Sequence, residues 1–203
     1  MTSLTIPNSV TSIGNWEFYG TAWYNNQPDG LVYAGSVAYR YKGTMPSGTS
    51  IVLKEGTKGI AGRAFSFCFG LTSVTIPNSV TSIGSDAFSF CSVLTRIDAY
   101  PNPEKVSTGA NAFYDVPKDG TLHVLPQYLS AYRTASQWED FTNIKGDLTE
   151  IGGIEVVRVD ELDHTLPVNV YNMNGVKMGD RLEDLPAGIY IVRQGSKSAK
   201  VVK

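Results

Sequence analysis

Apolar and polar residues alternate at the start of segment 72–84, whose sequence is TSVTIPNSVTSIG. Val74 and Ile76 alternate with Ser73 and Thr75, which is the period of a β-strand with one buried face. A proline then ends the run, an Asn-Ser pair supplies a turn, and a second short apolar stretch leads to a glycine that permits a tight bend. The segment therefore predicts two short strands joined by a turn.

The same pattern returns along the chain. Segment 2–14, TSLTIPNSVTSIG, is identical to segment 72–84 at twelve of thirteen positions. A more divergent copy lies between them, because a set of apolar residues recurs 23 positions later: Ile51, Leu53, Ile60, Phe65, Cys68 and Leu71 precede Val74, Ile76, Ile83, Phe88, Cys91 and Leu94. A period of 23 falls in the range of leucine-rich repeats.

One copy cannot bury its apolar face alone, so the copies are expected to stack into a solenoid with ladders of like residues along its axis. The ring ladder is predicted to comprise Phe18, Phe65, Phe88 and Phe113. The distance from Phe18 to Phe65 is 47 residues, so about one repeat length of other sequence separates the first two copies.

Cys68 and Cys91 occupy the same repeat position and are expected to be neighbours in this core. Two interpretations stay open. The thiols pack as small hydrophobic groups, or they form a disulfide, since adjacent coils lie about 5 Å apart. Neither His123 nor His164 shares the period, so no metal site is expected.

The additional sequence, about residues 21–49, predicts a β-hairpin around an Ala-Gly-Ser turn. It carries Trp23, Tyr33, Tyr39 and Tyr41 beside basic residues, a composition found at recognition hot spots. These rings either contact a partner or pack the hairpin against the coil.

After the last repeat, residues 121–146 predict an end cap. Thr121–Leu125 alternates like a strand, and Gln127–Trp138 places aromatic residues at helical spacing after Pro126. A short amphipathic helix is expected to cover the open end of the core. This part completes a predicted repeat domain of residues 1–148.

From residue 151 to 203 the period is lost and short β runs are separated by turn sequences. Asn174-Gly175 lies between two alternating segments, which is a strong hairpin signal. A small antiparallel β-sandwich is predicted here. The fold class is therefore mainly β, with a short repeat solenoid, an inserted hairpin, a helical cap and this second domain.

Composition narrows the possible functions. The 203 residues carry a formal net charge of -2, so no general positive field exists to hold nucleic acid. No apolar stretch approaches the length of a membrane span, and the first ten residues lack the features of a secretory signal. The common motifs for nucleophilic, zinc-dependent or phosphate chemistry are absent, and no cofactor is expected.

The segments TIPNSVTSIGSDAFSFC and VLKEGTKGIAGRAFSFC resemble the BspA-like leucine-rich repeat, and DGLVYAGSVAYRYKGTMP resembles an insertion common in that group. The resemblance covers about residues 1–147, although Glu17 replaces the usual Ala before the repeat Phe. The tail, from VYNMNGVKMG onward, is similar to C-terminal sorting domains of secreted bacterial proteins. The resemblance implies an extracytoplasmic binding or adhesion protein, at the cell surface or secreted, and carries no catalytic residues.

The leading hypothesis is a binding module that recognises host matrix or bacterial proteins, or glycans, through the repeat sheet and the hairpin. Its candidate contacts are Trp23, Tyr33, Tyr39, Tyr41, Lys54, Thr75 and Arg96. The outward positions of the strands are taken to be Ser3 and Thr5, Val52 and Lys54, Ser73 and Thr75, and Arg96 and Asp98. The alternatives are a structural spacer whose C-terminal domain serves export or anchoring, and a hydrolytic enzyme.

Overall fold

A computed structural model describes residues 3–148, 169–171, 177–181, 184–185, 189–194 and 197–202. The chain divides into two compact units, residues 1–149 and residues 150–203.

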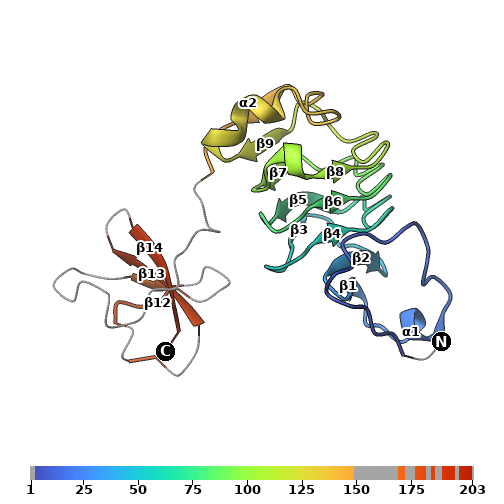
Figure 1. The fold of residues 1–203 in the computed structure, drawn as a ribbon, viewed down its shortest axis with the longest axis horizontal. Helices are drawn as coiled ribbons and strands as arrows, with labels where there is room; N and C mark the ends of the chain where they lie inside the picture. The colour runs from blue at the N-terminus through green and yellow to red at the C-terminus, as the bar shows by residue number, and fades with distance from the viewer. Residues whose placement is uncertain are drawn as a thin grey trace. The chain divides into compact units, whose positions relative to one another are not determined.

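The first unit is a solenoid with two sheets. One sheet is parallel throughout and has the order β10-β9-β7-β5-β3. Its strands stack along the coil in Figure 1. The bounds are β3 Thr49–Val52, β5 Leu71–Ile76, β7 Arg96–Ala99, β9 Thr121–Val124 and β10 Asn143–Lys145.

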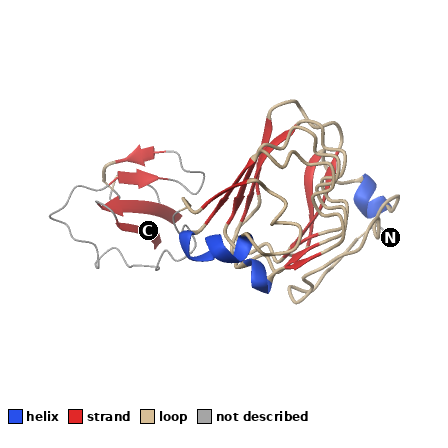
Figure 2. Cartoon of the chain, turned by 90° about the horizontal axis from the view of Figure 1, so that it is seen from above, coloured by secondary structure: helices blue, strands red, loops and turns tan. Residues whose placement is uncertain are grey.

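The other sheet has the order β1-β2-β4-β6-β8. Figure 2 shows the two sheets on opposite sides of each coil. The bounds are β1 Gly30–Ala34, β2 Val37–Lys42, β4 Gly59–Ile60, β6 Ser82–Ile83 and β8 Ser107–Thr108. The predicted solenoid of a mainly β protein is confirmed.

The 23-residue period of the sequence equals the spacing between residues that pair in neighbouring strands. Ser73 pairs with Arg96, and Gly59 pairs with Ser82, both 23 residues apart. The following coil is longer, because Ser107 pairs with Ser82 and Thr121 pairs with Arg96 at a spacing of 25, whereas Asn143 pairs with Thr121 at a spacing of 22. Extra residues are thus absorbed outside the strands, and the ladders continue without a break.

Gly84 has a different role from the one that its sequence context suggested. Its φ angle lies outside the left-handed region, so the bend does not require glycine for conformational freedom. Instead, a Cβ atom at this position would lie 2.4 Å from the backbone nitrogen of Gly62 in the preceding coil. The close approach of two backbones therefore selects glycine here.

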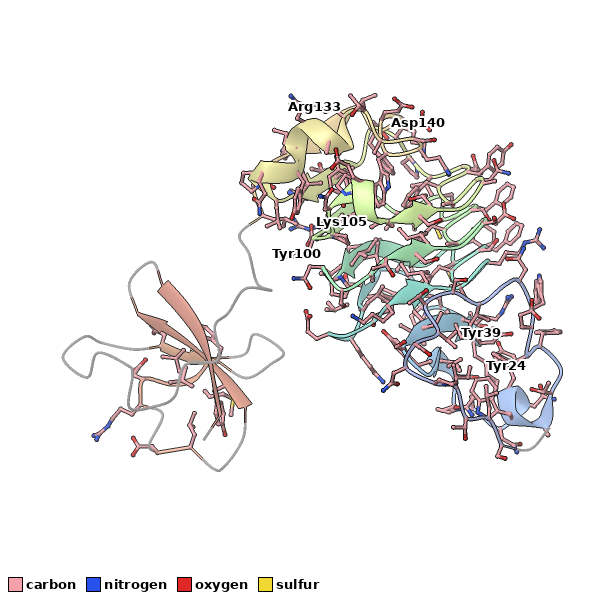
Figure 3. The ribbon with its side chains drawn as sticks, viewed as in Figure 1. Tyr24, Tyr39, Tyr100, Lys105, Arg133 and Asp140 are labelled. Carbon is pink, nitrogen blue, oxygen red and sulfur yellow. The ribbon has the colours of Figure 1, made fainter. Side chains whose placement is uncertain are left out.

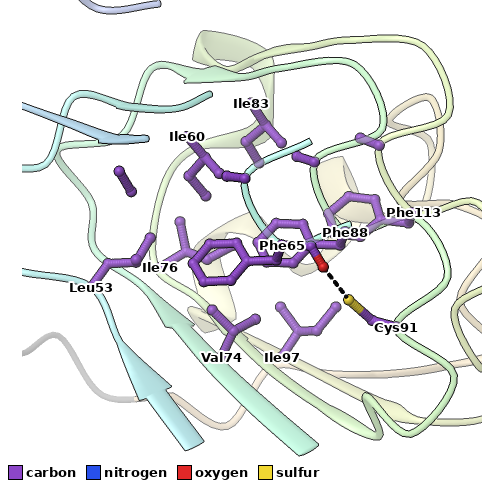
Figure 4. Close-up of a cluster of buried hydrophobic side chains, with 14 of the residues drawn as sticks. Leu53, Ile60, Phe65, Val74, Ile76, Ile83, Phe88, Cys91, Ile97 and Phe113 are labelled. Carbon is purple, nitrogen blue, oxygen red and sulfur yellow. Dashed lines mark hydrogen bonds between the residues drawn. The ribbon is translucent and has the colours of Figure 1, made fainter. Parts of the chain in front are cut away.

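The core contains the ring ladder shown in Figure 4. Phe65 stacks on Phe88 with centroids 5.1 Å apart, and Phe88 stacks on Phe113 at 5.5 Å. Trp138 of the cap continues the ladder, 4.5 Å from Phe113. The predicted ladder is right for these three phenylalanines and wrong for Phe18, whose ring contacts Trp23 and Tyr39 instead.

The hairpin explains why Phe18 is displaced. β1 and β2 pair antiparallel around the predicted turn, and β2 also pairs in parallel with β4. The second hairpin strand thereby occupies the coil position next to β4. The first repeat copy packs beside it, where the N–H of Gly62 donates to the Ile13 carbonyl at 3.2 Å.

Two short helices flank the coil. α1, Ala22–Asn25, begins after Thr21, whose side chain accepts a hydrogen bond from the Tyr24 N–H. In the cap, a 3-10 turn at Pro126–Tyr128 leads into α2, Leu129–Tyr132. A further 3-10 turn, η1, spans Pro103–Lys105. The cap helix is shorter than the predicted 127–138 segment, and Gln137 has a φ of 69°, which a right-handed helix cannot accommodate.

In the second unit, the described strands form one antiparallel sheet of order β12-β11-β13-β14. Its bounds are β11 Asn169–Tyr171, β12 Lys177–Gly179, β13 Ile189–Gln194 and β14 Lys197–Val202. β11 and β12 pair on either side of the predicted Asn174-Gly175 turn, which itself lies outside the described residues. The run IEVVRV of the predicted sandwich also lies outside them.

Candidate binding surface

The outer face of the five-stranded parallel sheet carries two rows of side chains. Because like positions of neighbouring strands pair, each coil contributes one residue to each row. The first row is Ser50, Ser73, Arg96, Thr121 and Asn143, and the second is Val52, Thr75, Asp98, His123 and Lys145. None of these ten residues is buried. We call this surface the row face.

The register corrects one expectation. The outward residues of β3 are Ser50 and Val52, which pair with Ser73 and Thr75, rather than Val52 and Lys54. Val52 is 73% exposed. Lys54 follows the strand and belongs to the next loop.

Arg96 and Asp98 are the charged pair at the centre of the row face. Arg96 Nε and Nη2 both donate to Asp98 Oδ2 at 3.2 Å. Asp98 Oδ1 lies 3.0 Å from Arg96 Nε, without the alignment of a hydrogen bond. It is the only buried side-chain polar atom among the described residues that lacks a hydrogen-bond partner. This oxygen is covered and lies within the ion pair, so the face presents Arg96 and Asp98 as one fixed charged group.

Asp98 lies near Tyr100 and His123. Burial raises the pKa of Tyr100, and the negative charge of Asp98 raises it further. On the neighbouring strand, His123 pairs in register with Asp98 and its Nδ1 lies 2.7 Å from Asp147 Oδ1. Acceptors and donors are thus concentrated at this end of the second row.

Lys54 and Tyr33 form a second polar feature. The backbone N–H of Lys54 donates to the Tyr33 hydroxyl at 2.9 Å, and the Lys54 ammonium lies 4.5 Å from the centre of the Tyr33 ring. Thr57 Oγ1 also lies within hydrogen-bond distance of this hydroxyl, at 3.3 Å. Tyr33 therefore ties the hairpin to the loop after β3 while Lys54 stays exposed.

The other hairpin aromatics lie at different depths. Tyr39 is buried, its hydroxyl accepts from the Phe18 N–H at 2.9 Å, and burial raises its pKa. Figure 3 places Tyr39 near Tyr24, and their ring centroids are 5.8 Å apart. Trp23 and Tyr41 are partly buried against the same core. Most of this aromatic surface is thus occupied by contacts within the chain.

A ladder of exposed aromatic rings was missed by the sequence reasoning. Phe67 stacks on Phe90 with centroids 4.6 Å apart and an interplanar angle of 7°. Phe69 contacts Phe67 edge to face, and Tyr114 contacts Phe90 in the same way. Phe67, Phe69 and Tyr114 are 57%, 62% and 57% exposed. We call these four residues the aromatic ridge; the 23-residue spacing of Phe67 and Phe90 was a signal available in the sequence.

A depression of about 200 Å³ lies between the last repeat and the cap, lined in part by Lys118 and Gln137. Both side chains already form hydrogen bonds within the chain. Lys118 Nζ donates to the Phe113 carbonyl at 2.8 Å, while Gln137 accepts from Ala112 and donates to Gly109. Burial lowers the pKa of Lys118. These contacts serve to hold the cap on the coil.

Cys68 and Cys91 are free, buried thiols, which decides between the two interpretations. Cys91 Sγ donates to the Phe65 carbonyl at 3.1 Å (Figure 4). Burial raises the pKa of both thiols to about 12. They therefore act as core residues.

No helix in the described ranges is long and apolar enough to cross a membrane. Neither the curated proteins nor the solved structures contain a match to this chain. The family model of the BspA type leucine-rich repeat region matches residues 1–114, with six copies. The repeats that the family model recognises correspond to the stacked coils of the solenoid, whose paired residues are 23 positions apart. The chain belongs to the BspA-type leucine-rich repeat family.

Proposed function

We propose that this chain is an extracytoplasmic adhesion module, at the cell surface or secreted, that binds a host matrix protein, a bacterial protein or a glycan through the row face. The observation that carries this proposal is the register of the parallel sheet, which sets the ten side chains of the row face, none of them buried, in two rows on one surface.

The composition of the face supports the same proposal. Serine and threonine side chains are short, so a flat ligand can approach the sheet closely along Ser73 and Thr75. The Arg96–Asp98 ion pair and Lys54, exposed in the loop after β3, add charged groups to these hydroxyls. Tyr33 adjoins the row face through its contact with Lys54. Tyr41 on β2 and Trp23 on α1 belong to the hairpin side of the coil, so these rings would contribute to a ligand that also contacts the hairpin.

Binding to immobilised collagen, laminin and fibronectin, and to a glycan array, tests the proposal. We compare the intact chain with the double variant Arg96→Ala/Asp98→Ala. The matched control is Arg63→Ala/Asp86→Ala, because that ion pair, at 3.3 Å, has the same residue types and lies outside the row face.

We expect the parent chain to bind at least one of these probes, and the row-face variant to lose about tenfold or more in affinity, while the control variant is unchanged. Equal binding by all three chains would remove the row face from consideration. Absence of binding to every probe would contradict the adhesion role.

A second role is proposed for residues 151–203, as a sorting or anchoring domain. Their separation into a compact unit of their own supports this proposal. Deletion of these residues is expected to stop export while residues 1–150 retain ligand binding. Loss of binding with normal export would reverse the two assignments.

A further inference from the structure

The outer edge of β3 presents backbone hydrogen-bonding groups to solvent. β3 lies at one end of the parallel sheet and, among the described strands, pairs with β5 alone (Figure 1). The Leu53 N–H donates to a carbonyl of β5, whereas the Lys54 N–H donates to the Tyr33 hydroxyl. Because successive N–H groups of a strand point to opposite sides, those of Ser50 and Val52 point away from β5. Both residues are exposed, so this strand edge is accessible.

The same sheet is also open at its other edge, β10, which pairs with β9 alone among the described strands. The register aligns one core-facing residue from each strand in a column: Ile51, Val74, Ile97, Leu122 and Ile144. The three inner members are buried, whereas Ile51 and Ile144 are only partly buried. Each end of the column therefore leaves apolar surface that a further strand would cover.

Segment 3–6 of the first repeat copy does not pair with the β3 edge. Its sequence, SLTI, differs from residues 73–76 of β5 at one position, but it belongs to neither sheet of the solenoid. Ile6 lies beside the hairpin turn instead, 3.1 Å from the position that a Cβ atom on Gly35 would occupy. A sequence that suits this edge is thus present in the chain, yet no described strand of the same chain pairs there.

The direction of the strands makes the two open edges complementary. The five strands of the sheet all run parallel. The β10 edge of a second copy would therefore meet β3 in the arrangement that already joins neighbouring coils. Two β3 edges related by a twofold axis would instead have to pair antiparallel.

The charges of the coil favour the same contact. Residues 3–70, which include β3, carry five cationic and three anionic side chains, a net charge of +2 with histidine neutral. Residues 71–148, which include β10, carry five cationic and eight anionic side chains, a net charge of -3. Lys54 follows β3, while Asp140 and Asp147 flank β10. Contact between unlike ends is thus attractive, and contact between like ends is repulsive.

We propose that the β3 edge binds the β10 edge of a second copy of this chain, so that copies join head to tail and continue the parallel sheet. In the register of the sheet, Ile144 of one copy packs on Ile51 of the next. The contact uses different surfaces on its two sides and does not close, so copies add in a line. Strands of four and three residues form a small interface, which predicts weak association. This inference does not depend on the proposed ligand of the row face.

Sedimentation equilibrium of the full chain tests the inference, at concentrations from about 1 µM to about 500 µM. Two variants each block one edge. Val52→Pro removes the outward N–H of β3, and Ile144→Lys puts an ammonium group at the β10 end of the column, where the single chain leaves it access to water. Val52→Thr is the matched control, because it removes the apolar side chain but keeps the N–H. Thermal unfolding of each chain is measured in parallel.

We expect the average mass of the parent to rise from 22.0 kDa past twice that value, and to rise less in about 1 M sodium chloride. Each blocking variant alone should stay at the monomer mass, and Val52→Thr should associate like the parent. An equimolar mixture of the two blocking variants should form pairs that stop at twice the monomer mass, because each variant keeps one open edge that fits the other.

A parent that remains monomeric throughout would overturn the inference. Dimers of Ile144→Lys alone would overturn it too, since β3 would then pair with another β3. A mixture that does not associate, although both variants melt like the parent, would exclude contact between the two edges. If a blocking variant melts well below the parent, the parent in salt decides: association that does not weaken in about 1 M sodium chloride contradicts attraction between unlike ends.

Discussion

The rings of Phe65 and Phe88 lie face to face in the core, with an interplanar angle of 2° and a centroid separation of 5.1 Å. Phe88 also stacks on Phe113, so it is the central member of the ladder. Three successive coils each contribute one ring to this ladder, and the ladder joins these coils into one core.

Phe88→Ala is expected to lower the free energy of unfolding by about 3–5 kcal/mol, because a fully buried ring leaves a cavity between two coils. Urea unfolding followed by circular dichroism measures the change. Phe18→Ala is the comparison, since Phe18 is half-buried and outside the ladder. Equal losses for the two variants would contradict the special position of Phe88.

Gly84→Ala is expected to destabilise the solenoid by about 1–3 kcal/mol or more, because the new Cβ would meet the backbone of Gly62. Gly14→Ala is the matched control. It occupies the same position of the first copy, where the new Cβ would meet only the flexible end of the Glu17 side chain. Melting temperatures of the two variants should differ clearly; similar values would contradict the close approach of coils as the reason for Gly84.

The thiols of Cys68 and Cys91 should be unreactive in the folded chain at pH 8. Both are buried and have a pKa of about 12, so the thiolate that attacks a disulfide reagent is scarce. Titration with a chromogenic disulfide reagent should detect no thiol in the native chain and both thiols after addition of urea. Rapid native labelling would place one of these cysteines outside the core.

Titration of the same two thiols should lower the free energy of unfolding as the pH rises. An unfolded thiol titrates near pH 9.0 and the native thiols titrate near 12, so between these values the unfolded chain has released protons that the native chain retains. The free energy of unfolding therefore decreases from about pH 9 toward pH 12. The variant Cys68→Ala/Cys91→Ala should show a shallower decrease in urea unfolding measured at each pH; an identical slope would contradict this assignment.

Gln137→Ala is expected to cost about 1–3 kcal/mol, because the side chain satisfies the Ala112 N–H and the Gly109 carbonyl at the junction of coil and cap. Differential scanning calorimetry should show a lowered transition for this variant. Ser136→Ala, at an exposed neighbouring position, should leave the transition in place. A neutral result for Gln137→Ala would mean that the cap is held by its apolar contacts alone.

The register of the solenoid could be predicted because one spacing applies to strands and core alike. Ser73 and Arg96 pair at the same interval that separates Phe65 from Phe88. The replacement of the first coil by β2 could not be predicted in this way. The alternation of residues 37–42 fits a hairpin strand and a solenoid strand equally well, and only the pairing with β4 distinguishes them.

The strand alternation also predicted part of the candidate site. Thr75 and Arg96 lie on the row face as their alternation indicated. Phe67 shares its period with Phe65, so the spacing alone does not separate an exposed ring from a buried one. The difference comes from the left-handed backbone at residue 67, which turns the chain between the two side chains.

Each coil supplies a single position to each row of the outer sheet, while a separate set of positions fills the interior. Substitutions at Ser73, Thr75, Arg96 or Asp98 would therefore change the chemistry of the proposed binding surface without repacking the centre of the solenoid. A library of variants restricted to the two rows would share one scaffold, and selection from it would yield binders that differ in specificity but unfold alike.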